Sequence, residues 1–169
     1  TVTDEIEIPE DVLPLAGAYG PATGLDPATL AKEKQAVVVD DRQAVLEGSW
    51  TEGEGLKGYV AYGYHYAGAD SGATARFELT APADGEYELL LAWQPHENRG
   101  TRVPVLIETS AGRSTTTLDM TKQPTLDGKF GSIARLRLSA EDPCVVVIST
   151  EGAGGFVHAD ALLLVPVTQ

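Results

Sequence analysis

The sequence predicts an all-β domain, an antiparallel β-sandwich of about nine strands that is jelly-roll-like or otherwise Greek-key in connectivity. Three observations indicate this fold class. Short β-type runs recur at spacings near ten residues, turn residues separate them, and helical periodicity is almost absent beyond residue 36. A chain of 169 residues also has the usual size of one domain with a single core.

The first 35 residues differ from the rest of the chain. Residues 1–11 are acidic, and four prolines interrupt a Gly- and Ala-rich stretch at positions 9, 14, 21 and 27. We therefore expect an N-terminal linker or extension over residues 1–35 and the β-sandwich over residues 36–169. Within the extension, Asp26 suits a helix N-cap and Pro27 suits the first helical position, which predicts one short helix.

The nine expected strands follow one another with turns between them. They are Ala36–Asp40, Tyr59–Tyr66, Ala73–Leu79, Glu86–Trp93, Val103–Thr109, Arg113–Met120, Ser132–Leu138, Cys144–Thr150 and Phe156–Val165. Several alternate apolar and polar residues, as half-buried antiparallel strands do. Cys144, the single cysteine, precedes four aliphatic residues, and we expect it to be a core residue rather than a reactive thiol.

Charge and hydropathy exclude two classes of partner. The chain has 25 acidic and 12 basic residues, a formal net charge of −13, which repels phosphate backbones and anionic lipid. No apolar run reaches 18 residues and the chain does not begin with a basic-then-apolar signal, so we expect a soluble chain. A mature secreted protein, or one domain of a larger protein, fits these features. We expect no nucleic-acid partner and no membrane partner.

No motif of a common catalytic mechanism is present. The sequence lacks GxSxG, HExxH, a phosphate-binding Gly-rich loop and a Cys cluster, and it has three scattered histidines, His65, His96 and His158. Pairs of carboxylates for glycoside hydrolysis carry no information in a chain this acidic. We therefore expect no catalytic residues and no enzyme, and an independent hydrolase or lyase is the third alternative.

Aromatic and polar residues gather in two segments, and these indicate a ligand site. Five aromatic residues fall between positions 50 and 66, and polar side chains follow a strand end at position 93. Aromatic rings stack on sugar rings, and the polar groups can bind hydroxyls. The candidate ligand-binding residues are Trp50, Tyr64, Trp93, His96, Asn98, Arg99 and Arg102. In the alternative, the tyrosines and Trp93 pack in the core.

Three aspartates are candidate ligands of a structural calcium ion. Asp40 and Asp41 end the first expected strand, and Asp160 lies in the last, which often runs beside the first in a closed sandwich. Carboxylate oxygens are the ligands that Ca²⁺ prefers. In the alternative, Asp160 accepts backbone hydrogen bonds from the opening strand.

Several phrases resemble the golvesin C-terminal-like domains, also described as the carbohydrate-binding-like part of xanthan lyases. They are Val37–Asp41, Gly48–Trp50, Gly58–Tyr64, Gly85–Leu89, Asn98–Val105 and His158–Leu162, in the family's order. The stretch from His96 to Val105 resembles domains appended to bacterial proteins labelled FAD-dependent oxidoreductases. Many relatives carry Trp near the position of Phe130. The resemblance implies a β-sandwich accessory module of an exported bacterial protein, secreted or extracytoplasmic, at the periplasm or cell surface.

Two functions remain in view. The first is a non-catalytic carbohydrate-binding module that targets a partner enzyme or a cell surface to a polysaccharide; Arg99 and Arg102 suit the carboxylates of an acidic one. The alternative is a structural or adhesion module that packs on a neighbouring catalytic domain. No cofactor is expected beyond the structural Ca²⁺.

Overall fold

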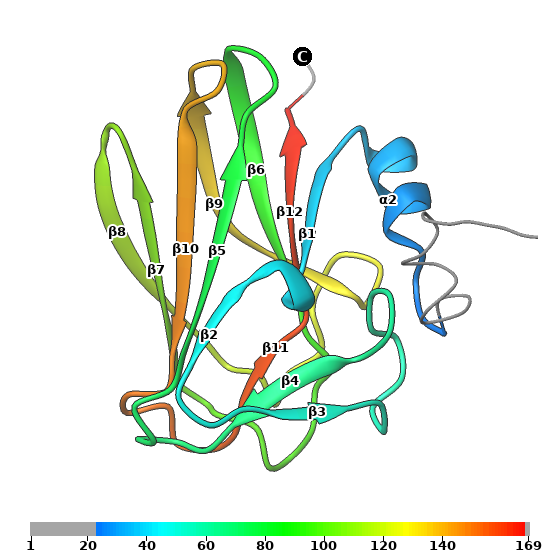
Figure 1. The fold of residues 1–169 in the computed structure, drawn as a ribbon, viewed down its shortest axis with the longest axis vertical. Coiled ribbons are helices and arrows are strands. Elements are labelled where there is room, and N and C mark those ends of the chain that lie inside the picture. The colour runs from blue at the N-terminus through cyan, green and yellow to red at the C-terminus, as the bar shows by residue number, and fades with distance from the viewer. Residues whose placement is uncertain (1–22, 168–169) are drawn as a thin grey trace, which may run out of the picture.

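Two antiparallel sheets face each other and form a β-sandwich, as the computed structural model of the chain shows (Figure 1). The structure describes residues 23–167. One sheet has the order β1-β12-β6-β9, formed by Val37–Asp40, Ala161–Pro166, Gly85–Ala92 and Phe130–Leu138. The other has the order β2-β5-β10-β7-β8, formed by Val45–Glu47, Thr74–Thr80, Pro143–Ser149, Val103–Thr109 and Gly112–Leu118.

A third, short sheet lies across one end of the sandwich, at the bottom of Figure 1. Its order is β11-β4-β3, formed by Val157–Ala159, Tyr64–Ala67 and Thr51–Gly53. Strand β11 continues almost directly into β12, with Asp160 between them. This sheet therefore places Tyr64 and Tyr66, two of the clustered aromatic residues, at the end of the sandwich where β12 begins.

The main core lies between the two large sheets, where alternate residues of each strand point inward. In β5 the buried residues are Ala75, Phe77 and Leu79, while the intervening Arg76 and Glu78 are exposed. The facing sheet contributes alternate residues of β6 and β12, including Leu89, Leu91, Leu162 and Leu164. Cys144 belongs to the same core, and burial raises the pKa of its thiol to about 11. The expectation of a core cysteine is confirmed.

The fold class is confirmed, and the described residues form twelve strands rather than about nine. Strands β2 and β3 have three residues each, too few to show an alternating pattern. The expected strand Tyr59–Tyr66 begins only at Tyr64, because Ala61 and Gly63 have φ values of 62° and 143° and bend the chain before it. The expected strand Phe156–Val165 divides at Asp160 into β11 and β12.

The short helix in the N-terminal extension is confirmed as α2, Pro27–Lys34. The Asp26 side chain accepts a hydrogen bond from the Thr29 backbone N–H at 3.0 Å, which caps the helix. Leu30 is buried against the outer side of the β1-β12-β6-β9 sheet, with Leu163 and Phe130 in the same cluster. The boundary between extension and sandwich at residue 36 stays a prediction, and residues 1–22 lie outside the described part.

Candidate ligand pocket and acidic cluster

A pocket of about 430 Å³ opens where the short sheet meets the loop that follows β6. Strand β4 contributes two tyrosines, the loop contributes three polar residues, and the chain just before β11 contributes a phenylalanine. The pocket is lined by Gly55, Leu56, Tyr64, Tyr66, His96, Asn98, Arg99 and Phe156. It therefore combines aromatic rings with a few polar groups, which is the usual composition of a small-ligand site.

The loop carrying Asn98 and Arg99 is fixed by backbone pairing with the Gly-rich segment. Phe156 N–H donates to the Asn98 carbonyl at 2.9 Å, and Gly100 N–H donates to the Phe156 carbonyl at 2.9 Å. The two backbones approach so closely that a Cβ at Gly155 would lie 2.6 Å from the Arg99 carbonyl oxygen. Glycine at 155 is therefore required for the loop to hold Arg99 in this position.

Arg99 is the central charge of the pocket, although its side chain is only 5% exposed. Its Nε–H donates to His158 Nδ1 at 3.1 Å, and its Nη1 donates to Asn98 Oδ1 at 3.0 Å. The guanidinium carbon lies 5.0 Å from the centre of the Tyr66 ring and 5.8 Å from that of Tyr64. Within residues 23–167 no carboxylate pairs with this cation. Its partners are all neutral, so a buried positive charge faces the pocket without compensation.

The aromatic rings form the walls of the pocket. Tyr64 is buried and stacks on the His158 ring at a centroid distance of 4.2 Å, and its hydroxyl accepts a hydrogen bond from the Leu56 backbone N–H at 2.9 Å. Phe156 is 39% exposed and meets the Tyr66 ring edge-on at 5.7 Å. Phe156 and the half-buried Tyr66 thus offer the accessible aromatic surface.

The structure brings four of the seven predicted ligand residues together: Tyr64, His96, Asn98 and Arg99. Trp93 is buried in the main core, where its Nε1–H donates to the Lys122 carbonyl at 2.9 Å. Trp50 is half-buried, and its Nε1–H lies between the Glu47 and Thr74 carbonyls. Arg102 is exposed and lies outside the lining of the pocket.

Sequence reasoning missed Tyr66 and Phe156 as pocket residues. The pattern predicts Phe156 in the closing strand, yet it follows the Gly-rich segment 152–155, and an isolated aromatic after such a turn is a signal for an exposed ring. The sequence pattern predicts Tyr66 on one strand face with the other tyrosines. Its partner across the short sheet is His158, which a sequence pattern does not reveal.

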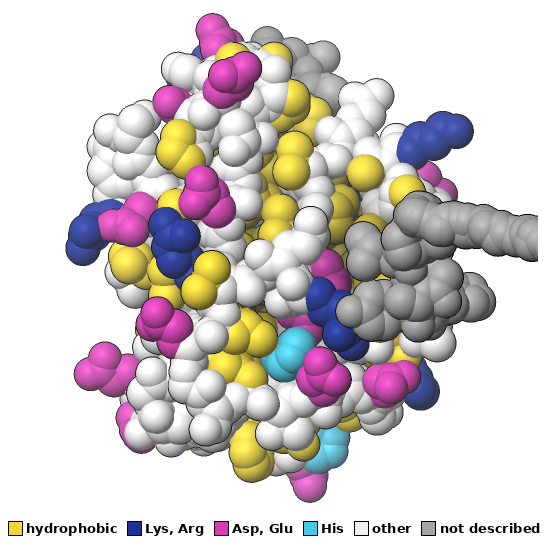
Figure 2. Space-filling model, viewed as in Figure 1, with side chains coloured by type: hydrophobic (Ala, Val, Ile, Leu, Met, Phe, Trp, Pro, Cys, Tyr) yellow, Lys and Arg dark blue, Asp and Glu magenta, His cyan; other side chains and the backbone are white. Residues whose placement is uncertain are grey.

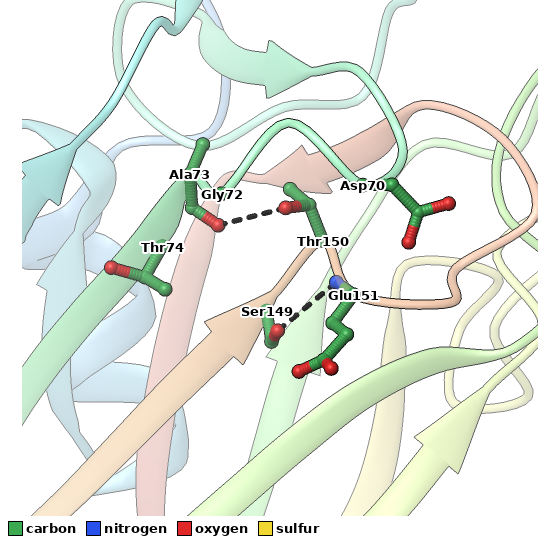
Figure 3. A pocket seen from close by; sticks show the side chains of 7 residues that line it. All are labelled: Asp70, Gly72, Ala73, Thr74, Ser149, Thr150 and Glu151. Carbon is green, nitrogen blue, oxygen red and sulfur yellow. Dashed lines mark hydrogen bonds between the residues drawn. The ribbon is translucent and has the colours of Figure 1, made fainter.

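A second hollow, of about 390 Å³, lies at the ends of β5 and β10 (Figure 3). It is lined by Asp70, Gly72, Ala73, Thr74, Ser149, Thr150 and Glu151. Its Thr150 hydroxyl donates to the Ala73 carbonyl at 3.0 Å, so that polar group is already satisfied. No aromatic or basic side chain lines it, which makes it a weaker candidate for a sugar or an anion than the Arg99 pocket.

The three aspartates predicted from the sequence do meet in the fold. One carboxylate oxygen from each of Asp40, Asp41 and Asp160 lies within 4.8 Å of the others, and all three residues are buried. We call these residues the acidic cluster. Asp41 Oδ2 lies 2.6 Å from His65 Nδ1, while Asp40 Oδ2 accepts a hydrogen bond from the Arg42 backbone N–H at 3.3 Å. The Oδ1 atoms of Asp40 and Asp41 are buried without a hydrogen-bond partner.

Asp160 has more partners than the other two aspartates. Both of its carboxylate oxygens accept from the Val60 backbone N–H, at 3.2 and 3.1 Å, and Oδ2 also accepts from Gln94 Nε2 at 3.0 Å. The opening strand is held differently, because the Asp41 N–H donates to the backbone carbonyl of Asp160 at 2.7 Å. Asp160 therefore has a structural role in the fold, and its carboxylate still lies close to those of Asp40 and Asp41.

Burial makes the acidic cluster costly to ionise. Desolvation, reinforced by the neighbouring Asp41 carboxylate, raises the pKa of Asp40 to about 8. Desolvation raises the pKa of Asp41 to about 7 and holds that of Asp160 well above its usual range. The cluster offers one carboxylate oxygen from each of three aspartates, and the Oδ1 atoms of Asp40 and Asp41 lack hydrogen-bond partners. Such a set of oxygens fits a hard divalent cation. His65 is a weaker base than usual, because burial lowers its pKa.

The comparisons with known proteins agree with this architecture. Residues 37–166 match the Golvesin C-terminal domain family. The xanthan lyase of Paenibacillus shares 25% sequence identity at a TM-score of 0.70, over 79% of this chain and 13% of that chain. A family 35 carbohydrate-binding module from Clostridium thermocellum shares 14% identity at a TM-score of 0.55, over 78% and 98% of the two chains. No curated protein matches the chain.

A mannanase of Podospora anserina that carries a family 35 module is also similar, with 17% identity and a TM-score of 0.57 over 79% of this chain and 28% of that chain. These distant likenesses show the β-sandwich fold. Among residues 23–167, no helix is long and apolar enough to cross a membrane. Because the family match covers most of the sequence, the chain belongs to the Golvesin C-terminal domain family.

Proposed function

We propose that this domain is a non-catalytic carbohydrate-binding module that binds an acidic polysaccharide in the Arg99 pocket. The observation that carries the proposal is the buried Arg99 guanidinium, which faces the pocket with no carboxylate partner among the described residues. A uronate carboxylate would supply the missing opposite charge. Binding is association without bond-breaking, and it raises the local concentration of whatever is attached to the domain.

The lining of the pocket suits a sugar acid. The Phe156 and Tyr66 rings give apolar surface for the face of a sugar ring, and Asn98 and His96 are exposed polar groups beside them. A guanidinium pairs with a carboxylate through two parallel hydrogen bonds, and the pair is stronger where water is excluded. The excess of acidic side chains, spread over the visible face in Figure 2, repels an anionic polymer elsewhere and leaves this pocket as the favourable contact.

The similar proteins support the biological setting of this proposal. One is a xanthan lyase, and others are carbohydrate-binding modules or enzymes that carry one. By this analogy the domain targets a partner enzyme or a cell surface to a polysaccharide, as part of a secreted or extracytoplasmic bacterial protein. Its partners are then the polysaccharide and a neighbouring catalytic domain of the same protein.

The alternative function is a structural or adhesion module that packs on a neighbouring catalytic domain. The exposure of Phe156, at 39%, favours it, because an accessible aromatic ring beside a buried arginine is also typical of a protein interface. In that case the carboxylate that meets Arg99 belongs to an Asp or Glu of the partner domain.

We also propose that the acidic cluster binds a structural divalent cation, with calcium as the best fit to its oxygen donors. Asp40, Asp41 and Asp160 would hold it, and the orphaned Oδ1 atoms of the first two would gain a partner. The cation would tie the end of β1 to the start of β12 by its charge. Its role is structural, since these carboxylates do not line the Arg99 pocket.

The experiment that tests the proposed function compares two arginines that lie three positions apart. Affinity electrophoresis measures the retardation of Arg99→Met and Arg102→Met in gels containing xanthan, alginate, pectin, fucoidan or a neutral glucan. We expect an acidic polymer to retard the wild type, and Arg99→Met to weaken binding about 30-fold or more, because truncating one partner of a desolvated charge pair costs ~2 kcal/mol or more.

Arg102→Met is the matched control, because it removes the same charge from an exposed site outside the pocket. It should retain wild-type retardation at moderate salt. Equal losses in both variants would indicate general electrostatic attraction rather than a site. Absence of retardation by every polymer would favour the structural module, and co-purification with the parent protein's catalytic domain would then be the next measurement.

A further inference from the structure

A continuous line of buried side chains connects the Arg99 pocket to the acidic cluster. Arg99 Nε–H donates to His158 Nδ1 at 3.1 Å, and His158 Nε2 lies 2.7 Å from Gln94 Oε1. Gln94 Nε2 then donates to Asp160 Oδ2 at 3.0 Å. The two middle residues are buried, His158 completely and Gln94 to 4% exposure. Neither of them lines the pocket, and neither belongs to the acidic cluster.

The donors and acceptors of this line fix one another. Asp160 accepts from Gln94, which turns the Gln94 amide so that its oxygen faces His158. That oxygen needs a donor, so His158 carries its proton on Nε2 and presents Nδ1 as an acceptor. Arg99 has no acceptor atoms, and it can bond to the ring nitrogen only in this tautomer.

One contact competes with this assignment of the tautomer, and it is the weaker one. The Gln94 backbone N–H also points at His158 Nε2, but at 3.4 Å, which is long for a hydrogen bond, so the 2.7 Å contact determines where the proton lies. Stacking on Tyr64 holds the plane of the His158 ring. Arg99 therefore donates to His158, His158 donates to Gln94, and Gln94 donates to Asp160. Through these three hydrogen bonds the Asp160 carboxylate determines the orientation of the Arg99 guanidinium.

We infer that Gln94 and His158 are positioning residues that couple the acidic cluster to the pocket, so that a divalent cation bound by Asp160 orders the Arg99 guanidinium for an anionic ligand. This inference rests on the proposed functions of both sites. A cation bound to the Asp160 carboxylate fixes the position of Oδ2, which accepts the hydrogen bond from Gln94. By thermodynamic linkage, an anion bound at Arg99 must then strengthen cation binding by the same factor. Ligand binding by this module is then calcium-dependent even though calcium does not touch the ligand.

The test follows the line by NMR with calcium alone as the probe. The wild-type His158 ring should show the tautomer protonated at Nε2. On titration with calcium, the Arg99 Nε–H signal should shift with the same midpoint as the Asp41 and Asp160 backbone signals. In Gln94→Met, which keeps the side-chain length and removes both hydrogen bonds, the Asp41 signal should still respond and the Arg99 signal should not. Gln123→Met, the same change at an exposed position, should behave as the wild type.

The outcomes separate the inference from the proposed functions. A calcium response at Asp41 with an unchanged Arg99 signal in the wild type overturns the coupling alone, as does a His158 ring protonated at Nδ1. No calcium response at any residue of the acidic cluster overturns the cation site and the coupling together, while the Arg99→Met gel result still decides whether the pocket binds an acidic polymer. For a polymer that retards the wild type, we expect calcium to raise the affinity about fivefold or more, and this gain to disappear in Gln94→Met.

Discussion

The Arg99 pocket and the acidic cluster both bury ionisable groups of one sign, basic in the pocket and acidic in the cluster. The buried groups are a guanidinium in the pocket and three carboxyl groups in the cluster. The difference lies in their hydrogen bonds: Arg99 is bonded to neutral acceptors and covered by aromatic faces, whereas Asp40 and Asp41 each have an orphaned oxygen. The guanidinium in the pocket is therefore stabilised even without a ligand. The ionised carboxylates of the acidic cluster, in contrast, destabilise the fold unless they bind a proton or a cation.

The largest effect we expect is the response of stability to calcium. A cation that binds only the folded state at a hundred times its Kd stabilises the fold by about 3 kcal/mol. The midpoint temperature of thermal unfolding should therefore be roughly 5–10 °C higher in calcium than in chelator. Asp40→Asn should abolish this rise and should be no less stable than the wild type in chelator at pH 8. Asp84→Asn, the same change in an exposed turn, should keep the full calcium response.

The second effect is the pH dependence of stability in chelator. Because burial raises the pKa of Asp40 to about 8 and of Asp41 to about 7, these two carboxyl groups bind more protons in the folded chain than in the unfolded chain between about pH 4 and these values. Stability should therefore fall as pH rises through this window, by an amount on the order of 2 kcal/mol. Urea unfolding of the wild type and Asp40→Asn between pH 5 and pH 8 measures it as a difference, because the lowered pKa values of His65 and His158 act in the opposite direction in both proteins.

Calcium should reduce or reverse this pH dependence, because the cation and the protons compete for the same oxygens. The stabilisation by calcium should thus be larger at pH 8 than at pH 5. In chelator, a wild type that loses no more stability than Asp40→Asn as pH rises over this range would contradict the assignment of strained carboxylates to the acidic cluster.

The third effect concerns the buried Arg99 guanidinium, whose hydrogen bonds go to neutral acceptors. Arg99→Met leaves the buried His158 Nδ1 without a donor, so it should destabilise the unliganded fold by about 1–2 kcal/mol. This is opposite in sign to the gain or neutrality expected for Asp40→Asn in chelator. Differential scanning calorimetry of the two variants under the same buffer gives the contrast directly. If Arg99→Met were stabilising, the guanidinium would be strained like the carboxylates.

The smallest effect concerns the rim of the pocket. Phe156→Ala should weaken the binding of the retarding polymer by about fivefold, since one aromatic contact contributes ~1 kcal/mol, and should leave the unfolding temperature nearly unchanged. Val45→Ala, at an apolar residue 54% exposed in β2 and outside the pocket, is the control and should bind as the wild type does. A large loss of stability in Phe156→Ala would assign the ring to packing rather than to the ligand.

The fold was largely predictable because its signal is local. Alternation in segments such as Ala75–Leu79 follows from one face packing on the core, and it needs no knowledge of partner strands. The three-residue strands β2 and β3 escaped prediction because they are shorter than one full alternation. The division of the closing strand at Asp160 escaped as well, because it depends on pairing: β11 pairs with β4 in the short sheet, whereas β12 pairs with β1 and β6 in a large one.

The sequence alone determined the fold class, the core cysteine, the family and the meeting of Asp40 and Asp41 with Asp160, because pattern, composition and the pairing of first and last strands are readable along one chain. Only the tertiary structure decided which aromatic residues are accessible. Trp93 looked like a binding residue and is a core residue, whereas Phe156 looked like a strand residue and lines the pocket. Exposure and charge compensation depend on residues far apart in the sequence, such as Arg99 and His158, which are 59 positions apart, and the sequence does not record which of them touch.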